Sequence, residues 1–129
     1  MLKINKVHHI AIICSDYEVS KHFYTKILGF EIIAEAYRSE RDSYKLDLAL
    51  NGNYSIELFS FPNPPGRVSR PEACGLRHLA FEVDDIQKTR HYLVENNLNP
   101  EPLRTDEFTN KRFTFIADPD NLPIEFYEA

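Results

Sequence analysis

The sequence is poor in cysteine and in long apolar runs, and each shortage excludes a class of protein. Its 129 residues include 2 cysteines. Two thiols are too few for a disulfide framework or a cysteine-based zinc cluster, so we expect ordinary reduced thiols. The longest apolar runs, such as residues 10–14, fall far short of the roughly 20 residues that cross a bilayer. The start of the chain also lacks the apolar stretch of a secretory signal. We therefore expect a cytoplasmic protein without a membrane partner.

Clustered positive charge is missing as well. The chain has 15 basic and 20 acidic side chains, for a net charge of -5. Because a nucleic-acid interface needs clustered lysine and arginine, we expect no nucleic-acid partner. The 43% of hydrophobic residues is typical of a globular protein, and the length fits a single domain over residues 1–129.

An internal repeat organises this domain. His9 opens an apolar run that is matched 69 residues later by the run after His78. A turn followed by Ile-Glu-apolar-aromatic also occurs twice, and it places Glu57 and Glu125 68 residues apart. Two matches at nearly the same offset predict two copies of a unit of about 65 residues, each too small to hold a good core alone.

Each copy has the residue pattern of a strand, a helix and three further strands. In the first copy the strands are expected over 7–14, 30–38, 44–50 and 54–61, and the helix from Asp16 to Gly29. In the second copy the strands are expected over 77–83, 101–105, 111–117 and 122–128, and the helix over 85–96. The sequence thus predicts an α+β fold of two tandem βαβββ modules, about 5–61 and 76–129, joined by the proline-rich linker 62–75.

Strand parity gathers four side chains of one chemical kind. Alternate residues of a strand face opposite sides, so the apolar residues of each strand define a helix-covered face. Four polar residues share the other face: His9, Glu57, His78 and Glu125. Two imidazoles and two carboxylates suit a divalent first-row metal ion.

These motifs resemble the vicinal oxygen chelate superfamily of glyoxalase, bleomycin resistance and dioxygenase proteins, and most closely its small bacterial glyoxalase I-like members. The resemblance rests on His-apolar-Ala-apolar-x-x-x-Asp, the Ile-Glu-apolar pairs and the ending Asp-Pro-Asp-x-x-x-Ile-Glu, and it covers nearly the whole chain. It implies paired modules whose mixed sheet curves around a cavity. It also implies one divalent ion (Ni, Zn, Co, Mn or Fe) on His9, Glu57, His78 and Glu125.

The activity that the resemblance implies is that of a glyoxalase I-like lyase or isomerase. Its small-molecule substrate would be a 2-oxoaldehyde adduct, such as that of methylglyoxal, or a related vicinal dioxygen compound. Glu125 would be the proton-transfer base, and the sequence leaves open whether Glu57 is a ligand, a base or both. One alternative is a protein that binds an antibiotic or metabolite without turnover. Another is a different metal enzyme of the superfamily, such as an epimerase, dioxygenase or thiol transferase.

The substrate pocket is expected to be apolar. Ile13 and Phe61 stand where characterised bacterial glyoxalase I has an arginine and an asparagine that hold glutathione, so we expect poor use of the glutathione adduct. Strand parity and the linker add four further pocket candidates: Phe59, Tyr127, Arg67 and Arg70. The stiff linker also favours a homodimer, with the ligands drawn from one chain or from both.

Overall fold

Two units make up the chain in the computed structural model, Met1–Pro65 and Gly66–Ala129, and all 129 residues are described. The first unit contains, in chain order, β1 (Ile10–Cys14), α1 (Tyr17–His22), the π-helical turn η1 (Phe23–Ile27), β2 (Glu31–Arg38), the 3-10 turn η2 (Ser39–Arg41), β3 (Ser43–Leu50) and β4 (Asn53–Ser60).

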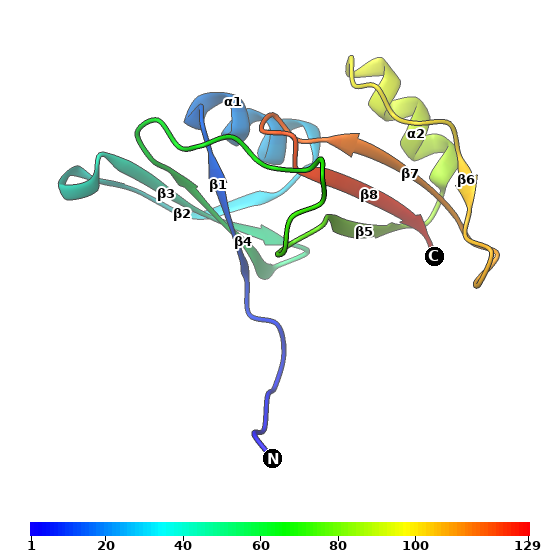
Figure 1. Cartoon of the computed structure of the whole chain (residues 1–129), viewed down its shortest axis with the longest axis horizontal. Coiled ribbons are helices and arrows are strands. Elements are labelled where there is room, and N and C mark those ends of the chain that lie inside the picture. Colours follow the sequence, from blue (N-terminus) through cyan, green and yellow to red (C-terminus); the bar gives the residue numbers. More distant parts are fainter. The chain divides into compact units, whose positions relative to one another are not determined.

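The sheet of the first unit has the strand order β1-β4-β3-β2. β1 runs parallel to β4, whereas β2, β3 and β4 pair antiparallel and lie side by side in Figure 1. The side chains of Ile12, Ile56 and Leu58 alternate along β1 and β4 and are buried. Glu57, between the two buried residues of β4, is only partly covered, as strand parity predicted.

The second unit repeats this architecture with β5 (Leu79–Val83), α2 (Ile86–Glu95), β6 (Arg104–Thr105), β7 (Arg112–Ala117) and β8 (Pro123–Glu128). Its sheet has the order β5-β8-β7-β6, with β5 parallel to β8 and the other pairs antiparallel. The matching element order and strand topology confirm the predicted α+β fold of two βαβββ modules.

Matching local signals start the two main helices. The carboxylate of Asp16 accepts a hydrogen bond from a backbone N–H in the first turn of α1 at 3.1 Å. Asp85 does the same for α2 at 3.0 Å. Both aspartates are therefore N-caps. The hairpin between β3 and β4 turns at Asn51 and Gly52, with φ of 50° and 78°, the left-handed conformation that tight two-residue hairpins need.

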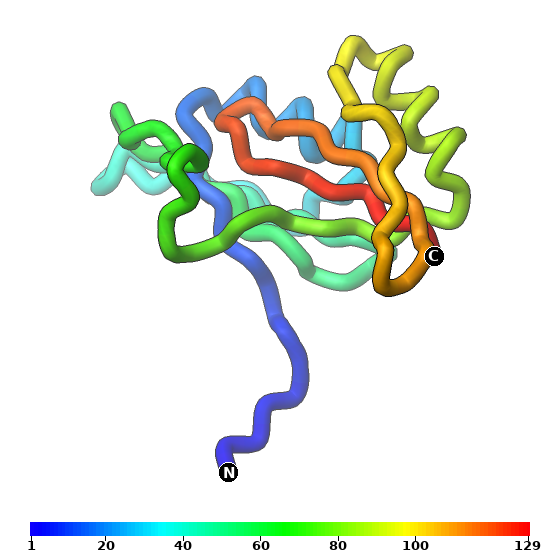
Figure 2. Tube along the Cα trace, turned by 45° about the vertical axis from the view of Figure 1, so that its right-hand side comes forward, coloured from blue at the N-terminus to red at the C-terminus, as the bar shows by residue number.

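The largest differences from the predicted element boundaries occur in three elements, and the others differ by one or two residues. β1 begins at Ile10 rather than at residue 7, and the preceding residues are exposed and lead away from the sheet (Figure 2). β6 covers only residues 104–105, since Pro102 has no N–H to give to a strand pair. The first helix changes to a π-helical turn after α1, where the Leu28 N–H donates to the Phe23 carbonyl at 3.0 Å.

The buried side chains are supplied by the helices and by alternate strand positions. In the first unit they include Tyr24, Leu46 and Leu58, and in the second Ile86 and Ile124, each less than 2% exposed. None of the helices has the length and apolar character that crossing a membrane requires. The core therefore fixes one face of each sheet and leaves the opposite face to the polar side chains considered next.

Candidate metal centre

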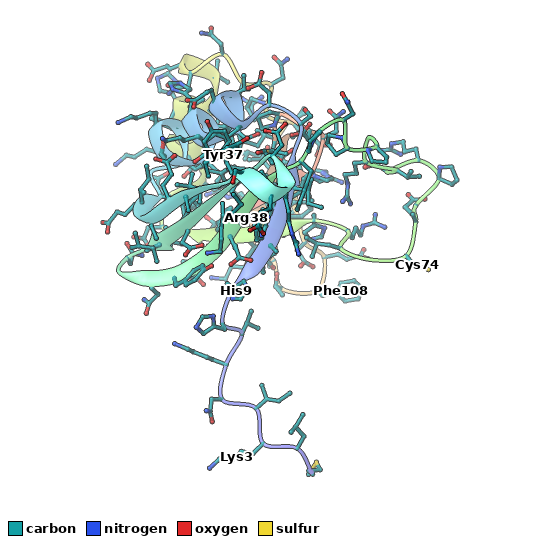
Figure 3. The ribbon with its side chains drawn as sticks, turned by 90° about the vertical axis from the view of Figure 1, so that its left-hand side faces the viewer. Lys3, His9, Tyr37, Arg38, Cys74 and Phe108 are labelled. Atoms are coloured by element: carbon teal, nitrogen blue, oxygen red, sulfur yellow. The ribbon has the colours of Figure 1, made fainter.

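The first pair of predicted ligands lies where β1 begins. His9 immediately precedes β1, and Glu57 lies in the middle of β4. The parallel register sets Ala11 beside Glu57, so His9, two residues earlier, falls on the same side of the sheet. Its Nε2 is 3.8 Å from Glu57 Oε1, and the two side chains are 36% and 16% exposed. Figure 3 shows His9 at this end of the strand.

The second pair has the same construction. His78 immediately precedes β5, and the register sets Ala80 beside Glu125 of β8. His78 Nε2 is 3.9 Å from Glu125 Oε1, with side chains 32% and 15% exposed. The edge of the His78 ring also meets Phe115, with ring centroids 5.2 Å apart. The sequence repeat is thus accompanied by the same His–Glu arrangement in the corresponding strands of both units.

The spacing within each pair suits two ligands of one ion. A nitrogen or oxygen donor lies about 2.1 Å from a divalent ion such as zinc, so two donors can be at most about 4.2 Å apart. Both pairs fall below this limit, and imidazole and carboxylate are donors that such ions accept. No group of three or more His, Cys, Asp or Glu side chains is gathered for a metal ion. The structure gives two pairs of candidate ligands, one in each unit.

The two glutamates differ in their neighbours. Glu57 Oε2 accepts a hydrogen bond from the Tyr54 hydroxyl at 3.1 Å and lies 3.4 Å from Lys45 Nζ. Asp47 belongs to the same cluster. Its Oδ1 accepts hydrogen bonds from Lys45 Nζ at 2.7 Å and from the Tyr54 hydroxyl at 2.9 Å. Burial, and then the hydrogen bonds to the two carboxylates, raise the pKa of Tyr54, so its hydroxyl stays a donor. By contrast, Glu125 has one ion-pair contact, with His78, and interacts electrostatically with the Tyr127 hydroxyl without a hydrogen bond to it.

The imidazole of His9 is held on both sides. Its Nδ1 lies 2.8 Å from Nδ1 of His8, and its ring stacks on Tyr54 with centroids 5.1 Å apart. A metal-binding histidine usually hydrogen-bonds through the nitrogen that does not face the ion, which fixes the orientation of the ring. No functional role was predicted for His8 from the sequence, and this contact was not anticipated. Two consecutive histidines at a strand start were the available signal.

Three of the predicted pocket residues come together in the first unit. Ile13 is 55% exposed and pairs in register with Phe59. Phe59 stacks on Phe61 with ring centroids 5.9 Å apart, and the Arg38 guanidinium lies 4.7 Å from the Phe59 ring centroid. Figure 3 labels Arg38. These residues form an aromatic surface with one cation on it, an arrangement that cation–π attraction stabilises.

Two other pocket candidates are engaged by their own unit. The Arg67 guanidinium donates to the carbonyls of Leu76 and Arg77 at 2.6 and 3.0 Å. The Tyr127 hydroxyl donates to Asp106 at 2.9 Å and is hydrogen-bonded to Thr109. Hydrogen bonds from a backbone N–H and from Tyr127 lower the pKa of Asp106. Binding of a ligand by Arg67 or Tyr127 would have to share or replace these contacts.

The last candidate, Arg70, lies in a cavity of about 500 Å³ that also contains His78. Arg77 and Arg104 line the same cavity, and sequence reasoning missed both. Arg77 directly precedes the predicted ligand His78, which was the signal available. No sequence signal pointed to Arg104, because its position depends on how β6 pairs with β7.

Comparison with known proteins assigns the chain to a family. Residues 6–126 match the model of the Glyoxalase/Bleomycin resistance protein/Dioxygenase superfamily. The chain belongs to this superfamily. Within it, the chain is 62% identical to YwkD of Bacillus subtilis over 125 residues (97% of this chain, 98% of YwkD). It is also 62% identical to YaeR of Escherichia coli over 128 residues (99% of both chains).

A solved member has the same fold. The glyoxalase family protein from Enterococcus faecalis is 46% identical, with a TM-score of 0.89 over 95% of this chain and 97% of that one. More distant superfamily relatives have named activities. They are the metallothiol transferase FosB of Staphylococcus epidermidis, 27% identical over 98% of this chain and 83% of FosB, and a 2-epi-5-epi-valiolone epimerase from Actinomyces, 27% identical over 92% and 76%. The named relatives thus catalyse different reactions, and one of them is named a metallothiol transferase.

Proposed function

We propose that the protein is a metal-dependent lyase or isomerase of the glyoxalase I type, acting on a small 2-oxoaldehyde adduct or a related vicinal dioxygen compound. One divalent ion would be held by His9, Glu57, His78 and Glu125. The observation that carries the proposal is the pair of matching His–Glu contacts, 3.8 and 3.9 Å long. The two contacts lie at equivalent positions of two equivalent parallel strand pairs, β1 with β4 and β5 with β8.

The donor set supports a metal rather than a plain salt bridge. Each pair lies on the open face of its sheet, partly exposed, where an ion and a ligand have access. Such donors accept Ni, Zn, Co, Mn or Fe. A FosX protein of Listeria monocytogenes, 18% identical with a TM-score of 0.76, has been solved with Mn(II). When bound, the ion would supply Lewis-acid polarisation of the substrate oxygens.

The unequal surroundings of the two glutamates support different roles. Tyr54 and Lys45 hold one oxygen of Glu57, so this carboxylate is kept in place as a ligand. Glu125 has a single ion-pair contact, with His78, and no side-chain hydrogen bond, so its carboxylate can turn. In the proposed reaction, an oxygen of Glu125 takes a proton from one carbon of the substrate and returns it to the neighbouring carbon. Glu57 keeps its charge and position throughout.

A second candidate function is another metal-dependent reaction of the superfamily. The similar identities to FosB and to the epimerase support it. The exposed Ile13 beside Phe59 supports a substrate other than a glutathione adduct, because an apolar surface offers no partner to glutathione's charged groups. The ligands and the base would be the same in either reaction, so the substrate is what distinguishes them.

Metal analysis of matched variants tests the proposal. The wild-type protein should bind close to one equivalent of metal, and His9→Ala or His78→Ala should remove most of it. The matched control is His91→Ala, since His91 Nε2 also lies near a carboxylate, 3.1 Å from Glu95 Oε1, but on the surface of α2. Metal binding should be unchanged in that variant. Retention of a full equivalent by both His9→Ala and His78→Ala would refute the proposed centre.

Substitution of the glutamates tests the division of roles. Glu125→Gln keeps an oxygen donor but removes the base, so turnover should fall by about 10²–10⁴-fold while metal is retained. Glu57→Gln should instead weaken metal binding first. If Glu57→Gln alone lost turnover while keeping its metal, Glu57 would be the base and Glu125 the ligand, contrary to the proposal. A survey of 2-oxoaldehyde adducts with several thiols would identify the substrate.

We also propose a homodimer, because the linker 62–75 contains four prolines and is stiff. Static light scattering at micromolar concentration measures this directly. A mass close to twice 15.1 kDa is the expected result. A mass equal to one chain across the concentration range would refute it.

A further inference from the structure

The cavity beside His78 has a charge that differs from that of the chain. The chain carries a net charge of -5, yet this cavity of about 500 Å³ is lined by Arg70, Arg77 and Arg104 and by a single acid, Glu101. Phe113 and Phe115 supply apolar walls. A concave surface with low-polarity walls strengthens the field of the charges that line it. The cavity is therefore suited to a negatively charged ligand.

Two of the three guanidinium groups are left for such a ligand. Arg104 is neutralised by Glu101, with Nη2 and Oε2 2.6 Å apart, and packs on Phe113 at 4.9 Å from the ring centroid. The guanidinium groups of Arg70 and Arg77 have no hydrogen-bond or ion-pair partner. Arginine presents its N–H groups as a planar fork that matches the oxygens of a carboxylate or phosphate.

The loop that carries these two arginines is closed by a third. Arg67 begins the segment, and its guanidinium donates to the carbonyls of Leu76 and Arg77 at 2.6 and 3.0 Å. These hydrogen bonds tie the start of the segment to the residues just before His78. Arg70 and Arg77 consequently line the same cavity although six residues separate them in the chain. They also line a neighbouring hollow of about 300 Å³, whose acid Glu72 forms no ion pair with either.

We propose that Arg70 and Arg77 form an oxyanion-binding subsite beside His78, and that the ligand of this protein is a small anion with a carboxylate or phosphoryl group. The choice of substrate class rests on the proposed function, since it is the metal ligand His78 that would bring the reacting oxygens next to this subsite. The subsite itself depends only on side chains of the second unit. Neutral vicinal dioxygen compounds would then bind more weakly than charged ones of the same size.

Anion titration of the full-length protein tests the subsite. Metal is first removed with a chelating resin, so that the probe cannot bind through an ion. Inorganic phosphate and acetate are then titrated while backbone amide NMR signals are followed. Saturable shifts should centre on residues 70–78 and 104, and the tighter of the two probes indicates whether the natural group is phosphoryl or carboxylate. Failure of both probes to produce saturable shifts there would overturn the proposal.

Single substitutions decide whether the arginines are responsible. Arg70→Gln and Arg77→Gln should each weaken binding of the tighter probe about tenfold, the lower end for a charge-assisted hydrogen bond at an exposed site. Arg41→Gln is the matched control, because Arg41 is an exposed, unpaired arginine of the first unit, and it should change the affinity less than twofold. Equal weakening by all three variants would indicate a general charge effect and overturn the subsite.

The metal analysis keeps this inference separate from the proposed function. A protein that binds metal, but whose anion affinity does not depend on Arg70 or Arg77, has the proposed centre without the subsite. A protein that binds no metal, but loses anion affinity in both variants, has the subsite without the centre. Each result overturns one proposal and leaves the other standing.

Discussion

Tyr54→Phe isolates the contribution of one hydrogen bond to the proposed metal centre. The variant loses the hydroxyl whose one proton is shared between Asp47 at 2.9 Å and Glu57 at 3.1 Å. It keeps the ring that stacks on His9, so the imidazole stays in place. Lys45 still lies 3.4 Å from Glu57. The substitution therefore loosens one ligand without removing it.

The size of the effect follows from the burial of that ligand. A hydrogen bond to a charged group contributes about 1.5–3 kcal/mol. The Glu57 side chain is partly exposed and keeps Lys45 as a second neighbour, so we take the lower value, about 1.5 kcal/mol. Since about 1.4 kcal/mol is a factor of ten in affinity, the metal dissociation constant should rise about tenfold. This agrees with the 10- to 100-fold typical of the residues that orient metal ligands.

Competition with a chromophoric chelator measures this constant for zinc or manganese. Tyr37→Phe is the matched control, because the Tyr37 hydroxyl also donates to a carboxylate, Asp42 Oδ1 at 2.6 Å, but beside the 3-10 turn η2. Figure 3 labels Tyr37. The control should bind metal as the wild type does. Tyr54→Phe with an affinity within twofold of the wild type would refute the argument that this cluster positions Glu57. An equal loss in both variants would refute it as well.

Three further predictions follow from the structure. Arg112 lowers the pKa of Glu128 to about 2, so their ion pair stabilises the fold above the usual glutamate pKa and ceases to do so as the pH falls toward 2. Arg112→Gln should accordingly lower Tm at pH 7, and the difference from the wild type should shrink between about pH 4.5 and 2; a constant difference across this range would contradict the assignment. Asp85→Ala removes the N-cap of α2 and should cost about 1 kcal/mol in urea unfolding, whereas a loss below about 0.3 kcal/mol would mean that the cap contributes little. Finally, Ile13 and Phe61 would leave polar groups of glutathione unpaired at about 1–3 kcal/mol each. If Arg70 and Arg77 do not pair with those groups instead, steady-state kcat/KM for the methylglyoxal adduct of glutathione should stay below about 10⁴ M⁻¹s⁻¹, and efficient turnover by the Arg70→Gln and Arg77→Gln variants would disprove this substrate argument.

The fold and the ligand pairs were accessible to sequence reasoning because both depend on local periodicity. Alternation along a strand fixes which side chains share a face, and it correctly set Glu57 opposite the buried Ile56 and Leu58. The duplicated His and Glu positions then predicted two copies of one module. These steps used only spacing along the chain and did not include the pairing of the strands.

The surroundings of the ligands depend on pairing between strands, which periodicity does not encode. Asp47 faces Glu57 only because of the antiparallel register of β3 and β4. That register also brings Lys45 to the same carboxylate. Tyr54 lies on β4 itself, and the irregular pairing at Leu48 and Ala49 lets its hydroxyl reach Glu57. Likewise, Arg104 reaches the cavity near His78 through the short pairing of β6 with β7. Each of these contacts joins residues whose proximity is set by tertiary structure.

The placement of one complete His–Glu pair within each unit has a consequence for genetics. A chain with His9→Ala has one intact pair and one damaged pair, and a chain with His78→Ala has the reverse. If a centre is completed by units of two different chains, mixing these two inactive proteins regenerates one centre with all four native ligands per heterodimer. If each chain completes its own centre, every centre in the mixture stays defective. Complementation between the two variants can therefore distinguish a centre formed by two chains from a centre formed within one chain.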